Sequence, residues 1–120
     1  MKKMIPKFRA FIKKENKIRN VTTIDFTLKI IECLNGVLEY EFEYVVLMQS
    51  TGLKDKNGVE IFEGDIGWDD HQEVHGQVIF ENGAFKYEWE NISEDLFEVT
   101  DDIEIVGNIY ENSELLEGSE

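Results

Sequence analysis

The segment DDHQEVH, residues 69–75, gathers side chains of the types that bind metal ions. It holds two histidines, His71 and His75, and Asp70 stands among its carboxylates. Two histidines four residues apart lie on one face of a helix, a spacing that zinc enzymes use. The surrounding residues, however, predict a loop that runs into a strand, where this spacing brings no ligands together. We interpret the segment as a solvated loop and keep a metal site on Asp70, His71 and His75 as the alternative.

A second set of residues with possible acid–base chemistry is the row of carboxylates at Glu39, Glu41 and Glu43. Alternate residues of a strand point to the same side, and neighbouring carboxylates perturb one another's pKa. Such a pair can divide the roles of acid and base. Nothing nearby in the sequence builds a pocket around the row. We therefore interpret it as an exposed sheet face and as part of an interaction surface.

Signatures of catalysis are missing from the sequence. It contains no nucleophile elbow, phosphate-binding loop or dinucleotide fingerprint. The single cysteine, Cys33, has no second cysteine with which to form a disulfide or a thiolate metal cluster. A packed, reduced thiol is typical of a cytoplasmic protein. We predict a cytoplasmic protein that is not an enzyme and uses no cofactor.

Charge is divided unevenly along the chain. The net charge is −14, but residues 1–20 carry +7 and residues 21–120 carry −21. An acidic body repels nucleic acids and anionic membranes, so we expect it to bind neither. The basic N-terminus is either a nucleic-acid arm or a partner for the protein's own acidic sheet, and we favour the second. No apolar run approaches the roughly 18 residues that cross a bilayer, and no signal peptide is expected.

The elements that position these residues are predicted to be strands. In the first half, apolar and polar residues alternate over residues 7–12, 23–30 and 37–48. The dipeptide Asn35-Gly36 signals a hairpin between the last two segments. A three-residue loop over 34–36 sets Ile30 opposite Tyr40, so that the apolar faces of the two strands meet. We predict this register.

Short strands and glycine-rich turns are also predicted for the second half. The strands cover residues 59–62, 65–68 and 102–110, with a hairpin over 74–90. Asn82-Gly83 is the turn of that hairpin. With Ser93 as its N-cap, a short helical turn is expected through Leu96 and Phe97, and another over residues 114–117.

This pattern is typical of a small barrel, and the chain length of 120 residues suits one domain. We predict a mainly β fold in which about residues 59–110 form an SH3-like barrel. Residues 1–50 add N-terminal strands and a long hairpin packed on the barrel part, 51–112, and residues 113–120 form an acidic tail. Barrels of this type bind peptides through aromatic grooves. The aromatic residues assigned to a possible interaction surface are Trp68, Tyr87 and Trp89.

Several stretches together resemble the YopX family of phage and prophage proteins. They are KFRAF with KENK, TGLKDKNGVEIFEGDI, GQVIFENGAF and IEIVGNIYENSELLE. The second is the most specific, and the stretches cover most of the chain. The resemblance implies an SH3-like component and a phage or prophage origin in a bacterial cytoplasm. It implies no activity.

Three functions are consistent with these observations. The first is a non-enzymatic module that binds an unidentified protein of the host or a second copy of itself. The second is a DNA mimic, in which carboxylates imitate phosphates and inhibit a host DNA-binding protein. The third is a metal-dependent hydrolase built on the DDHQEVH segment. We favour the first, because no catalytic signature accompanies the acidic surface.

Overall fold

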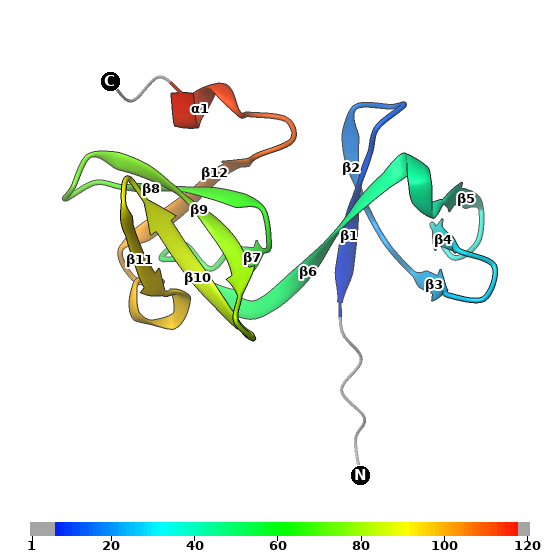
Figure 1. Ribbon diagram of the computed structural model, residues 1–120, viewed down its shortest axis with the longest axis horizontal. Coiled ribbons are helices and arrows are strands. Elements are labelled where there is room, and N and C mark those ends of the chain that lie inside the picture. The colour runs from blue at the N-terminus through cyan, green and yellow to red at the C-terminus, as the bar shows by residue number, and fades with distance from the viewer. Residues whose placement is uncertain (1–6, 118–120) are drawn as a thin grey trace, which may run out of the picture. The chain divides into compact units, whose positions relative to one another are not determined.

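A computed structural model describes residues 7–117 (Figure 1), and most of them lie in antiparallel strands. The mainly β fold class is therefore confirmed. The described residues divide into two compact units, which meet in the chain between Ser50 and Thr51. Residues 7–117 contain no helix with the length and apolar character that a membrane span requires.

The first unit is built from six strands and one 3-10 turn. They are β1 (Phe8–Ile12), β2 (Lys17–Asn20), β3 (Thr23–Asp25), β4 (Ile30–Cys33), β5 (Leu38–Glu41), η1 (Phe42–Tyr44) and β6 (Val45–Lys54), which continues into the second unit. Strand β1 pairs with β2 on one side and β6 on the other, and β4 lies between β3 and β5. Side chains of both sheets form one core, with Ala10, Ile12, Ile31, Cys33 and Val45 buried. The predicted strand at the start of the chain is confirmed, whereas β2 was not predicted.

The predicted long strand over residues 23–30 is wrong. The chain turns after Asp25, because the Asp25 carboxylate accepts the amides of Thr27 and Leu28, each at 2.9 Å. Such a side-chain acceptor offers the backbone an alternative to the strand ladder. Lys29 completes the turn at a φ of 60°, and β4 begins at the next residue.

The turn also makes the predicted hairpin register wrong. Ile30 lies opposite Glu41, and Ile31 lies opposite Tyr40. Because the strand restarts after a turn, its inward positions move by one residue, and Ile31 becomes fully buried instead of Ile30. The loop covers residues 34–37, and three successive residues in it have positive φ. The returning strand is also shorter than predicted, since η1 interrupts it after Glu41.

The second unit contains a curled antiparallel sheet of five strands, in the order β11-β10-β9-β8-β12 (Figure 1). Its elements are β7 (Glu60–Phe62), β8 (Asp65–Asp69), β9 (Val74–Glu81), β10 (Ala84–Trp89), β11 (Ile92–Asp95), η2 (Leu96–Glu98), β12 (Ile103–Asn108) and α1 (Glu114–Glu117). The hairpin at Asn82-Gly83 is confirmed, with Glu81 opposite Ala84. The helical turn expected through Leu96 and Phe97 is confirmed as η2, but its cap is Asp95, because Ser93 belongs to β11. The SH3-like barrel and the packing of the first half on it stay predictions.

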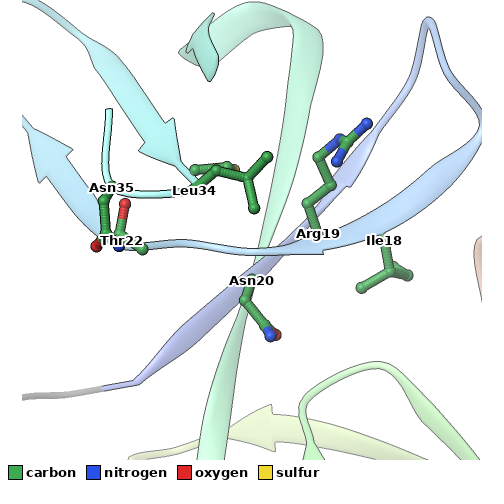
Figure 2. Close-up of a pocket in the computed structure, with 7 residues that line it drawn as sticks. Ile18, Arg19, Asn20, Thr22, Leu34 and Asn35 are labelled. Atoms are coloured by element: carbon green, nitrogen blue, oxygen red, sulfur yellow. The ribbon is translucent and has the colours of Figure 1, made fainter. Parts of the chain in front are cut away.

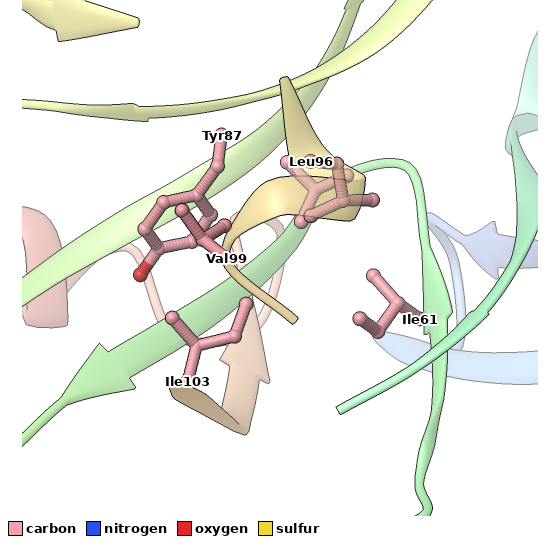
Figure 3. Close-up of a cluster of buried hydrophobic side chains, with 6 residues drawn as sticks. Ile61, Tyr87, Leu96, Val99 and Ile103 are labelled. Carbon is pink, nitrogen blue, oxygen red and sulfur yellow. The ribbon is translucent and has the colours of Figure 1, made fainter. Parts of the chain in front are cut away.

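Tyr87 lies in the centre of the second unit's core (Figure 3). Its ring covers Gly67 and Gly76, which face each other on β8 and β9. A Cβ on Gly76 would lie 2.5 Å from Tyr87 Cζ, and one on Gly67 would lie 2.9 Å from Tyr87 Oη. Two glycines therefore create the space for one large side chain. Buried aliphatic side chains complete this core: Ile61, Val78, Leu96, Val99 and Ile103.

Candidate interaction surfaces

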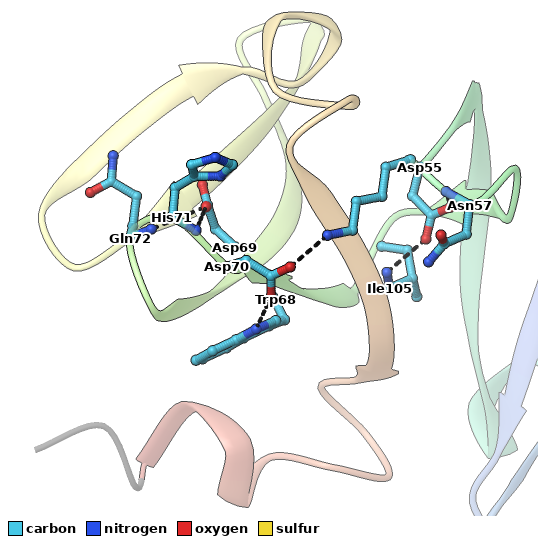
Figure 4. Close-up of polar contacts among 9 residues, drawn as sticks. Asp55, Asn57, Trp68, Asp69, Asp70, His71, Gln72 and Ile105 are labelled. Carbon is cyan, nitrogen blue, oxygen red and sulfur yellow. Dashed lines mark hydrogen bonds and ion pairs between the residues drawn. The ribbon is translucent and has the colours of Figure 1, made fainter.

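The DDHQEVH loop is held by hydrogen bonds that its own carboxylates accept (Figure 4). Asp69 Oδ1 accepts the amides of His71 at 2.8 Å and Gln72 at 3.2 Å. The two oxygens of Asp70 accept Trp68 Nε1 at 2.7 Å and Lys56 Nζ at 2.9 Å. Lys56 and then Trp68 hold the pKa of Asp70 below its ordinary value. These contacts form and anchor a turn. Within residues 7–117, no three histidine, cysteine or carboxylate side chains converge as metal ligands.

Two of the three predicted aromatic residues lie near one another on the second unit. The rings of Trp68 and His75 are cross-strand neighbours with centroids 4.7 Å apart. His75, Trp89 and Leu116 line the same hollow of about 250 Å³. Trp89 Nε1 donates to Glu94 at 2.9 Å, which fixes the indole.

Tyr87 is not part of a surface, and its assignment there is corrected. Its side chain is 1% exposed, because it stands in the middle of β10 and faces the core. Trp89 stands at the end of the same strand and reaches the surface hollow that His75 and Leu116 also line. Burial raises the pKa of the Tyr87 hydroxyl far above its ordinary value.

The predicted row of carboxylates is broken by η1. Glu39 and Glu41 lie on β5, whereas Glu43 belongs to the 3-10 turn. Glu39 and Glu41 line a hollow of about 950 Å³ in the first unit. The other residues around this hollow are Ile12, Lys13, Lys14, Glu15, Tyr40 and Tyr44. Glu43 contributes to the first unit through its carbonyl oxygen, which accepts Lys13 Nζ at 3.1 Å.

Glu15 lies at the edge of this hollow and is held by two neighbours. Tyr40 Oη donates to one carboxylate oxygen at 2.6 Å, and Arg19 Nε donates to the other at 2.8 Å. The hydrogen bond from Tyr40, followed by that from Arg19, lowers the pKa of Glu15. In return Glu15 raises the pKa of Tyr40. The network fixes the β1–β2 turn against β5, and sequence spacing gave no sign of it.

Figure 2 shows a second hollow in the first unit, of about 330 Å³, between β2 and the β4–β5 turn. Ile18, Arg19, Thr22 and Leu34 are among its lining residues, and Cys33 also contributes. The thiol is free and buried, as predicted. Burial raises the pKa of Cys33, so the thiolate that acts as a nucleophile or metal ligand is disfavoured.

The TGLKDKNG stretch closes a turn around one buried carboxylate. Asp55 is 5% exposed, and its Oδ1 accepts the amides of Asn57 and Val59, both at 2.9 Å. Its Oδ2 accepts the amide of Ile105 on β12 at 2.8 Å (Figure 4). Burial alone would raise the pKa of Asp55, but these three amides stabilise the carboxylate and lower the pKa overall. The carboxylate joins the turn to a strand about fifty residues away.

In two further motifs a buried side chain also accepts backbone amides and thereby forms a turn. In EGDI, Asp65 is 1% exposed and accepts the amide of Phe62 at 2.8 Å. In GNIYEN, Asn108 Oδ1 accepts the amides of Tyr110 and Glu111, both at 3.0 Å. Asn112 in turn accepts the Asn108 amide at 3.1 Å. The most distinctive stretches of the sequence therefore specify turns of the fold.

Residues 7–117 match the model of a family described as YopX protein. The chain belongs to the YopX family. This confirms the resemblance carried by the stretches KFRAF, TGLKDKNGVEIFEGDI and GNIYEN. The fold is similar to the crystal structure of protein EF1440 from Enterococcus faecalis, with 33% sequence identity and a TM-score of 0.72. That match covers 95% of this chain and 99% of the other. No curated protein matches the sequence.

The second unit of this YopX family member also carries an apolar groove that the sequence did not predict. It has a volume of about 250 Å³ and is lined by Leu53, Ala84, Phe85, Asp95, Leu96 and Phe97. We call it the Phe97 groove. Phe97 is 64% exposed and Phe80 is 50% exposed. The Phe80 and Phe85 rings meet edge to face, with centroids 4.9 Å apart. Aromatic residues on both sides of the Asn82-Gly83 turn are the one sequence signal that points to it.

Proposed function

We propose that this YopX family member is a non-enzymatic interaction module that binds a basic protein through its second unit. A phage or prophage encodes it, and it acts in the cytoplasm of the bacterial host. One observation carries the proposal: charge and structure divide at the same place. Residues 51–120 hold twenty carboxylates and three lysines, a balance of −17, whereas residues 1–50 have a balance of +3.

Few of the carboxylates in the second unit can be neutralised from within it. Lys56 pairs with Asp70 at 2.9 Å, and Lys86 pairs with Asp95 at 2.7 Å. Lys54 is the third and last lysine of residues 51–120. Nine other carboxylates of this unit are exposed: Glu73, Glu81, Glu90, Glu98, Asp101, Asp102, Glu111, Glu114 and Glu117. A surface of one sign attracts partners of the opposite sign and accelerates their association.

The non-enzymatic character has separate support. The buried carboxylates Asp55 and Asp65 accept backbone amides, and Cys33 is a buried thiol. In each case the side chain with potential chemistry has a structural partner or a packed environment. These roles account for the TGLKDKNG and EGDI motifs without a reaction.

Affinity capture tests the proposal. The immobilised full chain is incubated with a lysate of Enterococcus faecalis, a bacterium with a similar protein. The control variant carries Glu→Gln at 73, 81, 90 and 98 and Asp→Asn at 101 and 102. We expect the wild type to retain basic proteins at physiological salt and to release them as salt rises. The neutralised variant should lose them. Equal capture by both chains, or capture of nothing, contradicts the proposal.

The same segregation of charge favours DNA mimicry as a second candidate. In that case the basic partner is a DNA-binding protein, and duplex DNA competes with this chain for it. Adding duplex DNA to the captured complexes distinguishes the two candidates. Release by DNA at constant ionic strength supports mimicry, and retention supports a partner that does not bind DNA.

A further inference from the structure

We propose that the Phe97 groove binds one apolar side chain of a lysine- and arginine-rich segment in the partner protein. This inference rests on the proposed function, because it assigns the contact site and the chemistry of the partner. The apolar side chain fills the groove, and the flanking basic residues meet carboxylates around it. Strands β6, β10 and β11 and the turn η2 provide the lining residues.

The groove offers apolar surface that the fold leaves in water. Phe97, a lining residue, is 64% exposed. Phe80 is 50% exposed, and its ring meets that of the lining residue Phe85. Exposed apolar patches of this kind mark interaction sites when polar residues surround them. Phenylalanine is also among the residue types that are enriched at protein–protein interfaces.

The base of the groove is fixed by the core. Leu96 is fully buried and belongs to the cluster around Tyr87. Leu53 and Phe85 are partly buried and pack against the same cluster. The groove is therefore formed before a partner arrives, and binding does not require the ordering of its base.

Carboxylates surround one lysine beside the groove. Asp95 is a lining residue, and its carboxylate lies 2.7 Å from Lys86 Nζ. Glu81 and Glu98 also act electrostatically on Lys86 and, after Asp95, raise its pKa. One lysine cannot neutralise three carboxylates, so the rim retains negative charge.

The negative charge of the second unit distinguishes the possible occupants of the Phe97 groove. A second copy that contacts the groove through its own second unit meets like charge, because residues 51–120 carry −17 in each copy. Nucleic acid meets the same repulsion. A basic peptide segment with an apolar residue fits this site, because its apolar side chain fills the groove and its cationic side chains meet the carboxylates of the rim.

Defined peptides test this assignment on the full chain. The probes are short fluorescein-labelled peptides of lysine and arginine with a central leucine, phenylalanine or tryptophan. One counterpart has serine at the centre, and another has glutamates in place of the basic residues. Binding is measured by fluorescence anisotropy up to about 1 mM peptide. Amide chemical shifts of the isotope-labelled chain locate the contact.

We expect at least one basic peptide with an apolar centre to bind, and its affinity to fall about tenfold with serine at the centre. The acidic counterpart should not bind. Shifts should concentrate at residues 53, 84–86 and 95–98. The proposal is overturned if no peptide binds, if the central residue has no effect, or if the shifts lie elsewhere.

Substitutions in the chain give a matched comparison. Phe97→Ser should weaken binding about tenfold, and Glu81→Gln with Glu98→Gln should reduce its salt dependence. Phe26→Ser is the control, because Phe26 is 73% exposed but lies in the first unit. It should leave binding unchanged. Since Phe97 is exposed, Phe97→Ser should keep the circular dichroism spectrum and the urea midpoint of the wild type.

The lysate capture separates this inference from the proposed function. If Phe97→Ser still retains basic proteins that the neutralised variant loses, the groove assignment is wrong and the proposed function stands. If wild type and both variants retain the same proteins, both ideas are wrong. Loss of the same basic proteins from both variants supports both.

Discussion

Replacement of Asp55 by asparagine tests whether the TGLKDKNG stretch is structural. The substitution keeps the size of the side chain and an oxygen in the position of Oδ1, which accepts the amides of Asn57 and Val59. It places an NH₂ group opposite the amide of Ile105, where Oδ2 now accepts a hydrogen bond at 2.8 Å. Two donors then face each other in a buried position. One hydrogen bond is lost and two are weakened.

The expected loss in free energy of unfolding caused by Asp55→Asn follows from the type of hydrogen bond that the substitution removes. Bonds to charged groups contribute about 1.5–3 kcal/mol, and a buried donor left unsatisfied costs about 1–3 kcal/mol. We expect Asp55→Asn to lower the free energy of unfolding by about 2–4 kcal/mol. Small domains are stable by only about 5–15 kcal/mol, so the shift in urea midpoint should be large.

Tryptophan fluorescence during urea unfolding is the assay. Both tryptophans of the chain, Trp68 and Trp89, belong to the second unit, so their signal reports the unit that contains Asp55. Asp101→Asn is the matched control, because it makes the same chemical change at an exposed residue. A loss below about 0.5 kcal/mol, the usual range for surface substitutions, would refute the structural role of Asp55.

The difference between wild type and Asp55→Asn should also depend on pH. The pKa of Asp55 is lower in the folded protein than its ordinary value. The charged carboxylate therefore stabilises the fold fully above its unfolded pKa of about 3.9. This stabilisation is lost as pH falls through the lower, folded pKa. Urea midpoints should differ most above about pH 5 and converge in acid. A difference that grows as pH falls contradicts the assignment.

Three other predictions follow from single contacts. Gly76→Ala should destabilise the second unit by about 1–3 kcal/mol, measured by urea unfolding, because the new methyl group overlaps the Tyr87 ring; an unchanged midpoint contradicts the packing. Tyr40→Phe should raise the pKa of Glu15 in an NMR titration, because the hydrogen bond that Tyr40 Oη donates to Glu15 is the main cause of its lowered pKa; an unchanged pKa of Glu15 disproves that contact. Cys33 should react with iodoacetamide far more slowly in the native protein than in urea, because its thiol is buried and its pKa is raised; equal rates are inconsistent with a packed thiol.

Local patterns in the sequence predicted those elements that local forces determine. Asn82-Gly83 supports the positive φ angles of a two-residue hairpin turn, and alternating residues on both sides set its register. The same reasoning failed at Ile30, because an acceptor at Asp25 broke the strand and shifted the inward face by one residue. Periodicity predicts which face is apolar only while the strand continues.

The candidate interaction surfaces depend on where each residue lies in the folded chain, and the periodicity of the sequence does not give this information. Tyr87 and Trp89 share one strand pattern, yet only Trp89 lies at the strand end and reaches a surface hollow. Leu96 and Phe97 share the expected helical turn, yet Leu96 is fully buried and Phe97 is 64% exposed. Glu15 and Tyr40 are twenty-five residues apart and meet only because the β1–β2 turn lies against β5.

The amino-acid sequence by itself determined the strand-rich class, the family, the acidic second half and a buried thiol. Composition and short-range alternation are sufficient for these properties, since each depends on a residue and its immediate neighbours. The register around Ile30 follows from a local turn at Asp25 that the alternation of residues does not reveal. The tertiary structure decided the role of Asp55 and the Phe97 groove. Both require contacts between segments distant in the chain, and such contacts form only when the core selects which face of each strand it buries.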